Sequence, residues 1–189
     1  FPMEKFIGIW WSGHDGDMGS VGEAGKGYRA LSWNVPVSDA PLVADVRKHV
    51  IDAGKSQIGS QAEIDWVFYQ RGLMISLMGV EAIRAAQDHF NTKVVTPEQM
   101  RWGLENLDLS ETRLKELGAE GMLVPFKTSC ADHTGHGGAW MLEWDGAKFN
   151  KVSDLITPDR DTIAPLEAAE AKKYADANQP WPVSTECNL

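Results

Sequence analysis

The segment KTSCADHTGHGG, residues 127–138, holds the densest group of potentially reactive side chains in the sequence: Cys130, Asp132, His133 and His136. A thiolate, a carboxylate and two imidazoles are all accepted zinc ligands, so one interpretation is a metal-dependent hydrolase that uses this cluster. Zinc sites with such short spacing usually draw further ligands from elsewhere in the chain. The other histidines fall in a predicted loop and on two predicted helix faces, where a solvated or capping role is ordinary.

The same segment allows two other interpretations. Cys130 could act as a nucleophile assisted by His133, although no helix N-terminus is predicted after it to stabilise a thiolate. Alternatively, the two cysteines of the chain, Cys130 and Cys187, form a disulfide in an oxidising compartment, and the glycines after His133 shape a bend before a strand. Such a bond would contribute on the order of 4 kcal/mol on the loop-entropy account. The three interpretations remain open at this stage.

Aromatic side chains gather at the ends of two predicted elements. The exit of an apolar strand carries Trp10, Trp11 and Ser12, and the start of a long apolar helix carries Phe68, Tyr69 and Arg71. Strand ends and helix starts are the places where α/β proteins bind ligands. Core packing would explain the aromatic rings equally well, and Arg71 would suit a surface or inter-helix ion pair.

Composition and charge exclude several classes of function. The 189 residues are 43% hydrophobic, enough for one large core or two small ones. The net charge is -9 and basic residues occur at most in pairs, so nucleic acid and anionic membranes are not expected partners. No apolar run approaches the roughly 20 residues of a membrane-spanning helix. The sequence begins at Phe1, and we expect a processed or truncated product.

Helices and strands interleave along the chain, which predicts an α/β fold. We expect a buried strand at 5–11, a second strand at 28–35 and a hairpin within 140–152. Helices are expected at 39–54, 66–90, 97–107, 110–118 and 163–177. Thr96 and Gln99 have the spacing of a capping box. Gly72 and Gly79 in the longest helix are expected to permit close helix packing.

Eight segments, taken in chain order, carry a resemblance that covers nearly the whole sequence. They are WWSGHDGD, GKGYRAL, VRKHVIDAGK, YQRGL with EAIRAA, TPEQMRWGLENL, RLKELGAEG and SCADHTGHGGAWMLEWDG. This series resembles the C-terminal half of a periplasmic solute-binding protein of the branched-chain amino acid ABC-transporter type. The resemblance implies a type I periplasmic-binding-protein fold, an α/β fold of two lobes joined by three chain crossings, with only its C-terminal portion present.

The resemblance also implies an organisation and a set of partners. Residues 1–35 would end lobe two, 36–138 would be the last part of lobe one, and 139–189 would form the return crossing strand, the hairpin and a C-terminal extension. The protein would be periplasmic, with its signal peptide removed, and would have no enzymatic activity and no cofactor. Its partners would be a small-molecule solute, the permease subunits of an ABC importer and the missing N-terminal half of the same protein.

One departure from the family pattern bears on the ligand. Amino-acid-binding members hold a glutamate for the ligand ammonium in the loop after the first strand, whereas the matching positions here are Trp11-Ser12-Gly13. Asp15 and Asp17 lie nearby but do not align with that glutamate. An α-amino acid is therefore a poorer expectation than another small organic acid, which we expect to be aromatic, branched-chain amino-acid-like or otherwise apolar and to be bound between the two lobes.

The expected ligand contacts follow from the same resemblance. One face of the ligand ring would lie on Trp10 or Trp11. The other would lie on Phe68 or Tyr69, with the carboxylate on Arg71 or on helix N-terminal amides. The segment KTSCADHTGHGG would precede the last crossing between lobes. A disulfide from Cys130 to Cys187 would then hold the C-terminal tail, and the metal-dependent hydrolase is kept as the alternative function.

Overall fold

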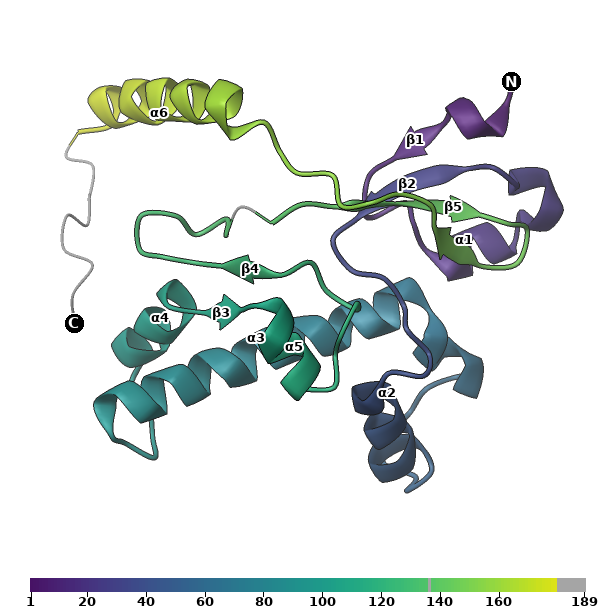
Figure 1. Cartoon of the computed structure of the whole chain (residues 1–189), viewed down its shortest axis with the longest axis horizontal. Helices are drawn as coiled ribbons and strands as arrows, with labels where there is room; N and C mark the ends of the chain where they lie inside the picture. Colours follow the sequence, from purple (N-terminus) through teal and green to yellow (C-terminus); the bar gives the residue numbers. More distant parts are fainter. Residues whose placement is uncertain (136, 180–189) are drawn as a thin grey trace.

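A four-stranded sheet and a group of helices make up most of the chain (Figure 1). The computed structural model describes residues 1–135 and 137–179. The sheet has the order β1 (Ile7–Gly8), β2 (Arg29–Ser32), β5 (Trp140–Trp144) and β6 (Phe149–Lys151). β1 is parallel to β2, and the other pairs are antiparallel. A second, two-stranded sheet joins β3 (Asp108–Leu109) to β4 (Phe126–Lys127).

The helices lie mainly between β2 and β5 in the sequence. They are α1 (Asp15–Gly19), α2 (Pro41–Val46), α3 (Val67–Phe90), α4 (Pro97–Glu105), α5 (Glu111–Glu116) and α6 (Arg160–Ala177). Short 3₁₀ turns occupy Met3–Lys5, Gly22–Gly25 and Gln61–Asp65, and a π-helical turn, Arg47–Ile51, continues α2. The predicted capping box is confirmed, because Thr96 accepts from the Gln99 amide and the Gln99 side chain accepts from the Thr96 amide.

The predicted hairpin is also confirmed. Trp140, Leu142 and Trp144 alternate with less buried residues along β5, so one face of this strand points into the core. The turn that follows is held by Asp145, whose Oδ1 atom accepts hydrogen bonds from the amides of Ala147 and Lys148. The strand period and the turn chemistry therefore agree, which is why this part of the fold could be read from the sequence.

Two clusters of buried apolar side chains form the core. The helix-side cluster is built from α2 to α5 and the chain that follows them, and it includes Val43, Met74 and Leu114. The sheet-side cluster includes Leu142 and Trp144 of β5. Trp33, which directly follows β2, packs against both clusters. The tryptophan therefore lies at the boundary between the helices and the four-stranded sheet.

Two expectations from the sequence are wrong. The apolar run at 5–11 forms only the short edge strand β1, and Ile7 and Ile9 are 60% and 62% exposed, because no described element covers them. Gly72 and Gly79 approach no other element within 4 Å. The close approach is made by Gly103 of α4, where an added Cβ would stand 2.1 Å from the carbonyl oxygen of Ala82 on α3.

The last helix, α6, stands away from the sheet and the helices (Figure 1), and none of its residues is buried. Among the described residues, no helix combines the length and apolar character needed to cross a membrane.

Substitution of the two glycines should separate packing from helix propensity. Gly103→Ala should lower the free energy of unfolding by about 1–3 kcal/mol, because the methyl group forces α3 and α4 apart. The control Gly79→Ala should raise it by up to about 1 kcal/mol, because alanine favours the helix and nothing opposes its side chain. Urea unfolding of the natural full-length protein measures both values, and equal effects would contradict the packing described here.

Candidate ligand-binding site

Arg71 is the buried centre of the candidate site. Its side chain projects from the second turn of α3, and the residue is 3% exposed. Nε donates to Oδ1 of Asn34 at 2.7 Å, one terminal nitrogen donates to the carbonyl of Trp10 at 2.9 Å, and the other donates to Oγ of Ser32 at 3.1 Å. One guanidinium thus joins α3 to the segment after β1 and to the end of β2.

The charge of Arg71 has no acidic partner in the described residues. Within 1–135 and 137–179, no carboxylate forms an ion pair with its guanidinium, so the alternative of a surface or inter-helix ion pair is wrong. Desolvation by burial lowers the pKa of Arg71 to about 10, which leaves the group charged at neutral pH. Burying a cation without a counter-ion carries a large desolvation cost. An anion that reached this group would offset part of that cost.

Four aromatic rings surround the guanidinium, and we call them the aromatic box: Trp10, Trp11, Trp33 and Phe68. The guanidinium carbon lies 4.7 Å from the ring centre of Phe68, 5.4 Å from that of Trp33 and 5.8 Å from those of the other two. These distances are in the range of cation–π contacts, which favour the charged form. Trp10 is 41% and Trp11 58% exposed, so these two rings form the side of the box that faces solvent.

Asn34 and Ser32 accept hydrogen bonds from the guanidinium and fix its position. Asn34 is fully buried, and its Nδ2 atom donates to the carbonyl of Val67 at 3.0 Å while Oδ1 accepts from Arg71. Ser32 donates to the Asn34 carbonyl at 2.7 Å. Both side chains therefore have their hydrogen bonds satisfied, and the network fixes where Arg71 can lie.

The segment after β1 touches α3 at two further points. The His14 ring is stacked on Phe68, with ring centres 4.2 Å apart and an angle of 7° between the planes. Oδ2 of Asp15 accepts a hydrogen bond from the Val67 amide at 2.8 Å. Because Asp15 already occupies this end of α3, a ligand carboxylate there would meet a like charge. Of the two predicted carboxylate partners, the geometry favours Arg71 over the helix amides.

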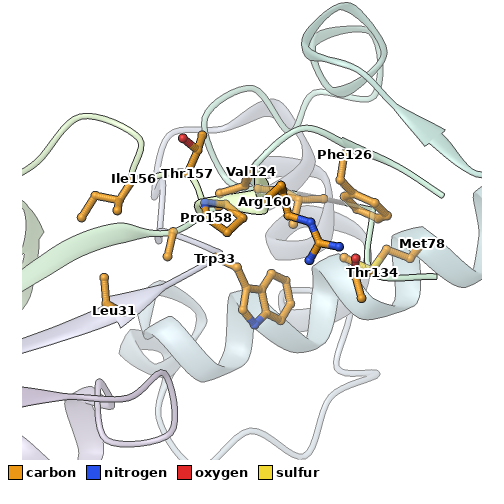
Figure 2. A pocket seen from close by; sticks show the side chains of 14 residues that line it. Leu31, Trp33, Met78, Val124, Phe126, Thr134, Ile156, Thr157, Pro158 and Arg160 are labelled. Atoms are coloured by element: carbon orange, nitrogen blue, oxygen red, sulfur yellow. The ribbon is translucent and has the colours of Figure 1, made fainter. Parts of the chain in front are cut away.

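A separate apolar cavity of about 630 Å³ lies where β2, α3 and the chain on either side of β5 and β6 meet (Figure 2). Its wall includes Leu31, Trp33, Met78, Phe126, Ile156 and Pro158. Arg160 and Thr134 also line it, but Arg160 pairs with Glu167 at 2.8 Å and the Thr134 hydroxyl bonds to Asp132. The cavity thus has an apolar character, and it shares one residue, Trp33, with the aromatic box.

Comparison with known proteins finds two solved structures with this fold. No protein-family model matches the chain, and no curated protein matches it. One match is a crystal structure described as an ABC transporter permease from the Pseudomonas fluorescens group, at 34% identity and a TM-score of 0.90 over 98% of this chain. The other is a branched chain amino acid ABC transporter from Thermus thermophilus with bound valine, at 22% identity and a TM-score of 0.63 over 84% of this chain.

Both matched proteins are ABC transporter components. The chain spans 45% of the length of the first and 41% of the length of the second. The predicted α/β class agrees with the mixed sheets and helices, and the two-lobed architecture and its division of the chain stay predictions.

The structure brings four of the six predicted ligand-binding residues together: Trp10, Trp11, Phe68 and Arg71. The other two lie apart from this group. Ser12 donates its hydroxyl to the carbonyl of Ile9 within its own turn, and Tyr69 packs against the helix-side cluster. Binding of a ligand by any of the six stays a prediction.

Sequence reasoning missed five residues of the site: His14, Asp15, Ser32, Trp33 and Asn34. A signal for two of them was present, because Ser32 and Asn34 follow Ala30 at the buried positions of an alternating strand. A polar side chain on a buried strand face needs a buried partner. His14, Asp15 and Trp33 make their contacts with α3, and no short-range sequence pattern indicates such contacts.

The described residues of the KTSCADHTGHGG cluster contact different partners in the structure. Oδ1 of Asp132 accepts from the amide and hydroxyl of Thr134, while Nε2 of His133 lies 3.3 Å from Oε1 of Glu105. Within 1–135 and 137–179, no three His, Cys, Asp or Glu side chains converge as a metal site would require. His136 and Cys187 lie outside the described residues, so both the four-residue hydrolase cluster and the Cys130–Cys187 disulfide stay predictions.

Removing the buried amide of Asn34 should destabilise the protein. Asn34→Leu leaves Nε of Arg71 without its acceptor and removes the side-chain donor to the Val67 carbonyl, and we expect a loss of about 2–4 kcal/mol. Asn178→Leu, at an exposed asparagine at the end of α6, is the matched control and should change the free energy of unfolding by less than about 0.5 kcal/mol. Thermal and urea unfolding measure the difference, and similar stabilities would rule out a structural role for the network.

Proposed function

We propose that this chain is part of the solute-binding component of an ABC importer and that it binds a small aromatic organic acid at the aromatic box. The observation that carries the proposal is Arg71, a buried cation that four rings surround and that no described carboxylate neutralises. The ligand carboxylate would supply the missing negative charge. Its ring would extend over the exposed faces of Trp10 and Trp11.

The hydrogen-bonding capacity of Arg71 is consistent with such a ligand. A guanidinium has five N–H donors, and three of them are used by Asn34, Trp10 and Ser32 in the described residues. One donor remains on each terminal nitrogen. These are the two atoms that a carboxylate contacts when it binds in a bidentate manner.

An organic acid fits this site better than an amino acid does. The ammonium group of an amino acid needs an acceptor, but residues 10–13 contain no acid, and the nearby carboxylate of Asp15 bonds to Val67. Arg71 would in addition repel an ammonium group. The valine bound to the Thermus thermophilus protein supports a solute-binding role for the fold, whereas the ligand class proposed here depends on this chain's own residues.

The proposal extends to the rest of a longer protein and to its location. The chain spans less than half of either matched protein, and Phe6, Ile7 and Ile9 at the edge of the sheet are exposed. We propose that an N-terminal half pairs with β1, covers the apolar cavity and supplies the second wall of the ligand site. Residues 1–35 would form the end of lobe two and residues 36–138 the last part of lobe one. Residues 139–189 would cross back from lobe one and form the hairpin and the C-terminal extension. The protein would act in the periplasm and deliver its solute to permease subunits, without catalysing a reaction.

Replacement of Arg71 should weaken the binding of an aromatic carboxylate. With benzoate as the probe, Arg71→Met should raise Kd by about 10- to 100-fold, because a charge-assisted hydrogen bond pair and the buried charge are both lost. Arg84→Met is the control, since Arg84 lies on the same helix but is exposed. Isothermal titration of the natural full-length protein measures Kd. Tight binding of leucine that is undiminished in Arg71→Ala would refute the proposed ligand class.

Asn34→Asp tests whether the charge of Arg71, and not its shape, attracts the ligand. The new carboxylate would stand where Oδ1 of Asn34 now accepts from Nε, 2.7 Å away, and would neutralise the guanidinium from inside. Benzoate binding should fall by about 10-fold or more although Arg71 is still present. Wild-type affinity in a folded Asn34→Asp protein would show that the ligand does not use this charge.

A further inference from the structure

Asp15 caps a helix to which it does not belong. The residue begins α1 and is 8% exposed, yet its Oδ2 atom accepts the amide hydrogen of Val67, the first residue of α3, 52 positions away. Trp66, at the N-cap position of α3, makes no side-chain cap bond. The cap that short-range sequence would normally supply is therefore provided by a remote carboxylate.

The charge of Asp15 is offset mainly by α3 itself. In residues 1–135 and 137–179, no lysine, arginine or histidine forms an ion pair with this carboxylate. The positive end of a helix dipole favours a carboxylate at this position, and α3 is 24 residues long. Asp15 thus attaches the segment that carries it to the first residue of α3.

The same short segment supplies the solvent-facing side of the aromatic box. Trp10 accepts from Arg71 through its carbonyl, Trp11 has its ring 5.8 Å from that of Phe68, and His14 is stacked on Phe68. Three side chains of residues 10–15 therefore depend on how this segment meets the first turns of α3. The Asp15 bond is the contact at the far end of that segment.

We propose that Asp15 is a positioning residue of the ligand site: it fixes residues 10–15 against α3, so that Trp10, Trp11 and His14 stand beside Phe68. The inference rests on the proposed function for what the site binds, but not for the contact itself. Asp15 does not touch the ligand. It holds Trp11 and His14 in contact with Phe68, and so keeps the exposed ring faces beside Arg71 in place.

A first experiment tests the contact without any ligand. In Asp15→Ala, the Val67 amide should exchange with solvent at least about 10-fold faster, while the amides of Ala82 and Ala86 deep in α3 keep their protection. The stacked Phe68 ring should shift the His14 ring proton resonances in the wild type, and in Asp15→Ala they should move towards the values of an unstacked imidazole. Asp17→Ala is the matched control, because Asp17 is an exposed acid of the same helix, and it should change neither signal.

A second experiment links the contact to binding. Asp15→Ala should raise the Kd of benzoate about 10-fold through faster dissociation, because the walls of the box are no longer held. Val67→Pro removes the donor at the first helical position, where proline is tolerated, and should have the same effect. If both changes break one interaction, the double variant should bind no more weakly than either single variant.

The outcomes separate this inference from the proposed function. Unchanged Val67 exchange and His14 signals in Asp15→Ala would overturn the positioning role, as would an equal loss of protection at Ala82 and Ala86. Additive effects of Asp15→Ala and Val67→Pro on Kd would overturn it as well. If the wild type binds no benzoate while Asp15→Ala still releases Val67 and His14, the positioning role stands and the proposed ligand class fails.

Discussion

The arrangement of this chain depends on a cation that is buried without an acid beside it. Arg71 is charged at neutral pH, and its desolvation is offset only by three neutral acceptors and four ring faces in the described residues. Each acceptor comes from a different position in the sequence. The segment after β1, the end of β2 and α3 must therefore converge for the guanidinium to be tolerated at all.

This convergence explains why polar side chains occupy buried positions where an apolar side chain would cost less desolvation free energy. Asn34 is fully buried at the boundary between the helices and the sheet, and it serves both Arg71 and the Val67 carbonyl. A leucine there would suit the core but not the cation. The site and the junction of the two apolar clusters are consequently built from the same residues, and neither can change alone.

The helices and strands could be predicted from the sequence better than the contacts between them. The capping box at Thr96 and the hairpin that begins at Trp140 depend on neighbours in the chain, and both were predicted correctly. The aromatic residues at two element ends were recognised as a group, but Trp33 and Asp15 were not. Their partners lie on α3, tens of residues away, and a lone aspartate in a glycine-rich loop has no local mark of a cap. The exposure of β1 escaped prediction because an apolar run does not reveal whether anything covers it.

The edge strand β1 has a consequence for how sequences of this kind can vary. In the described part of the chain, β1 is paired on one side only, so its outer edge offers main-chain donors and acceptors. A strand that joins such an edge is recognised by its backbone, which every amino acid except proline provides in full. Pairing at the outer edge of β1 would therefore depend little on which side chains the two strands carry. Substitutions along this edge would therefore leave such a pairing intact, provided that no proline enters the strand.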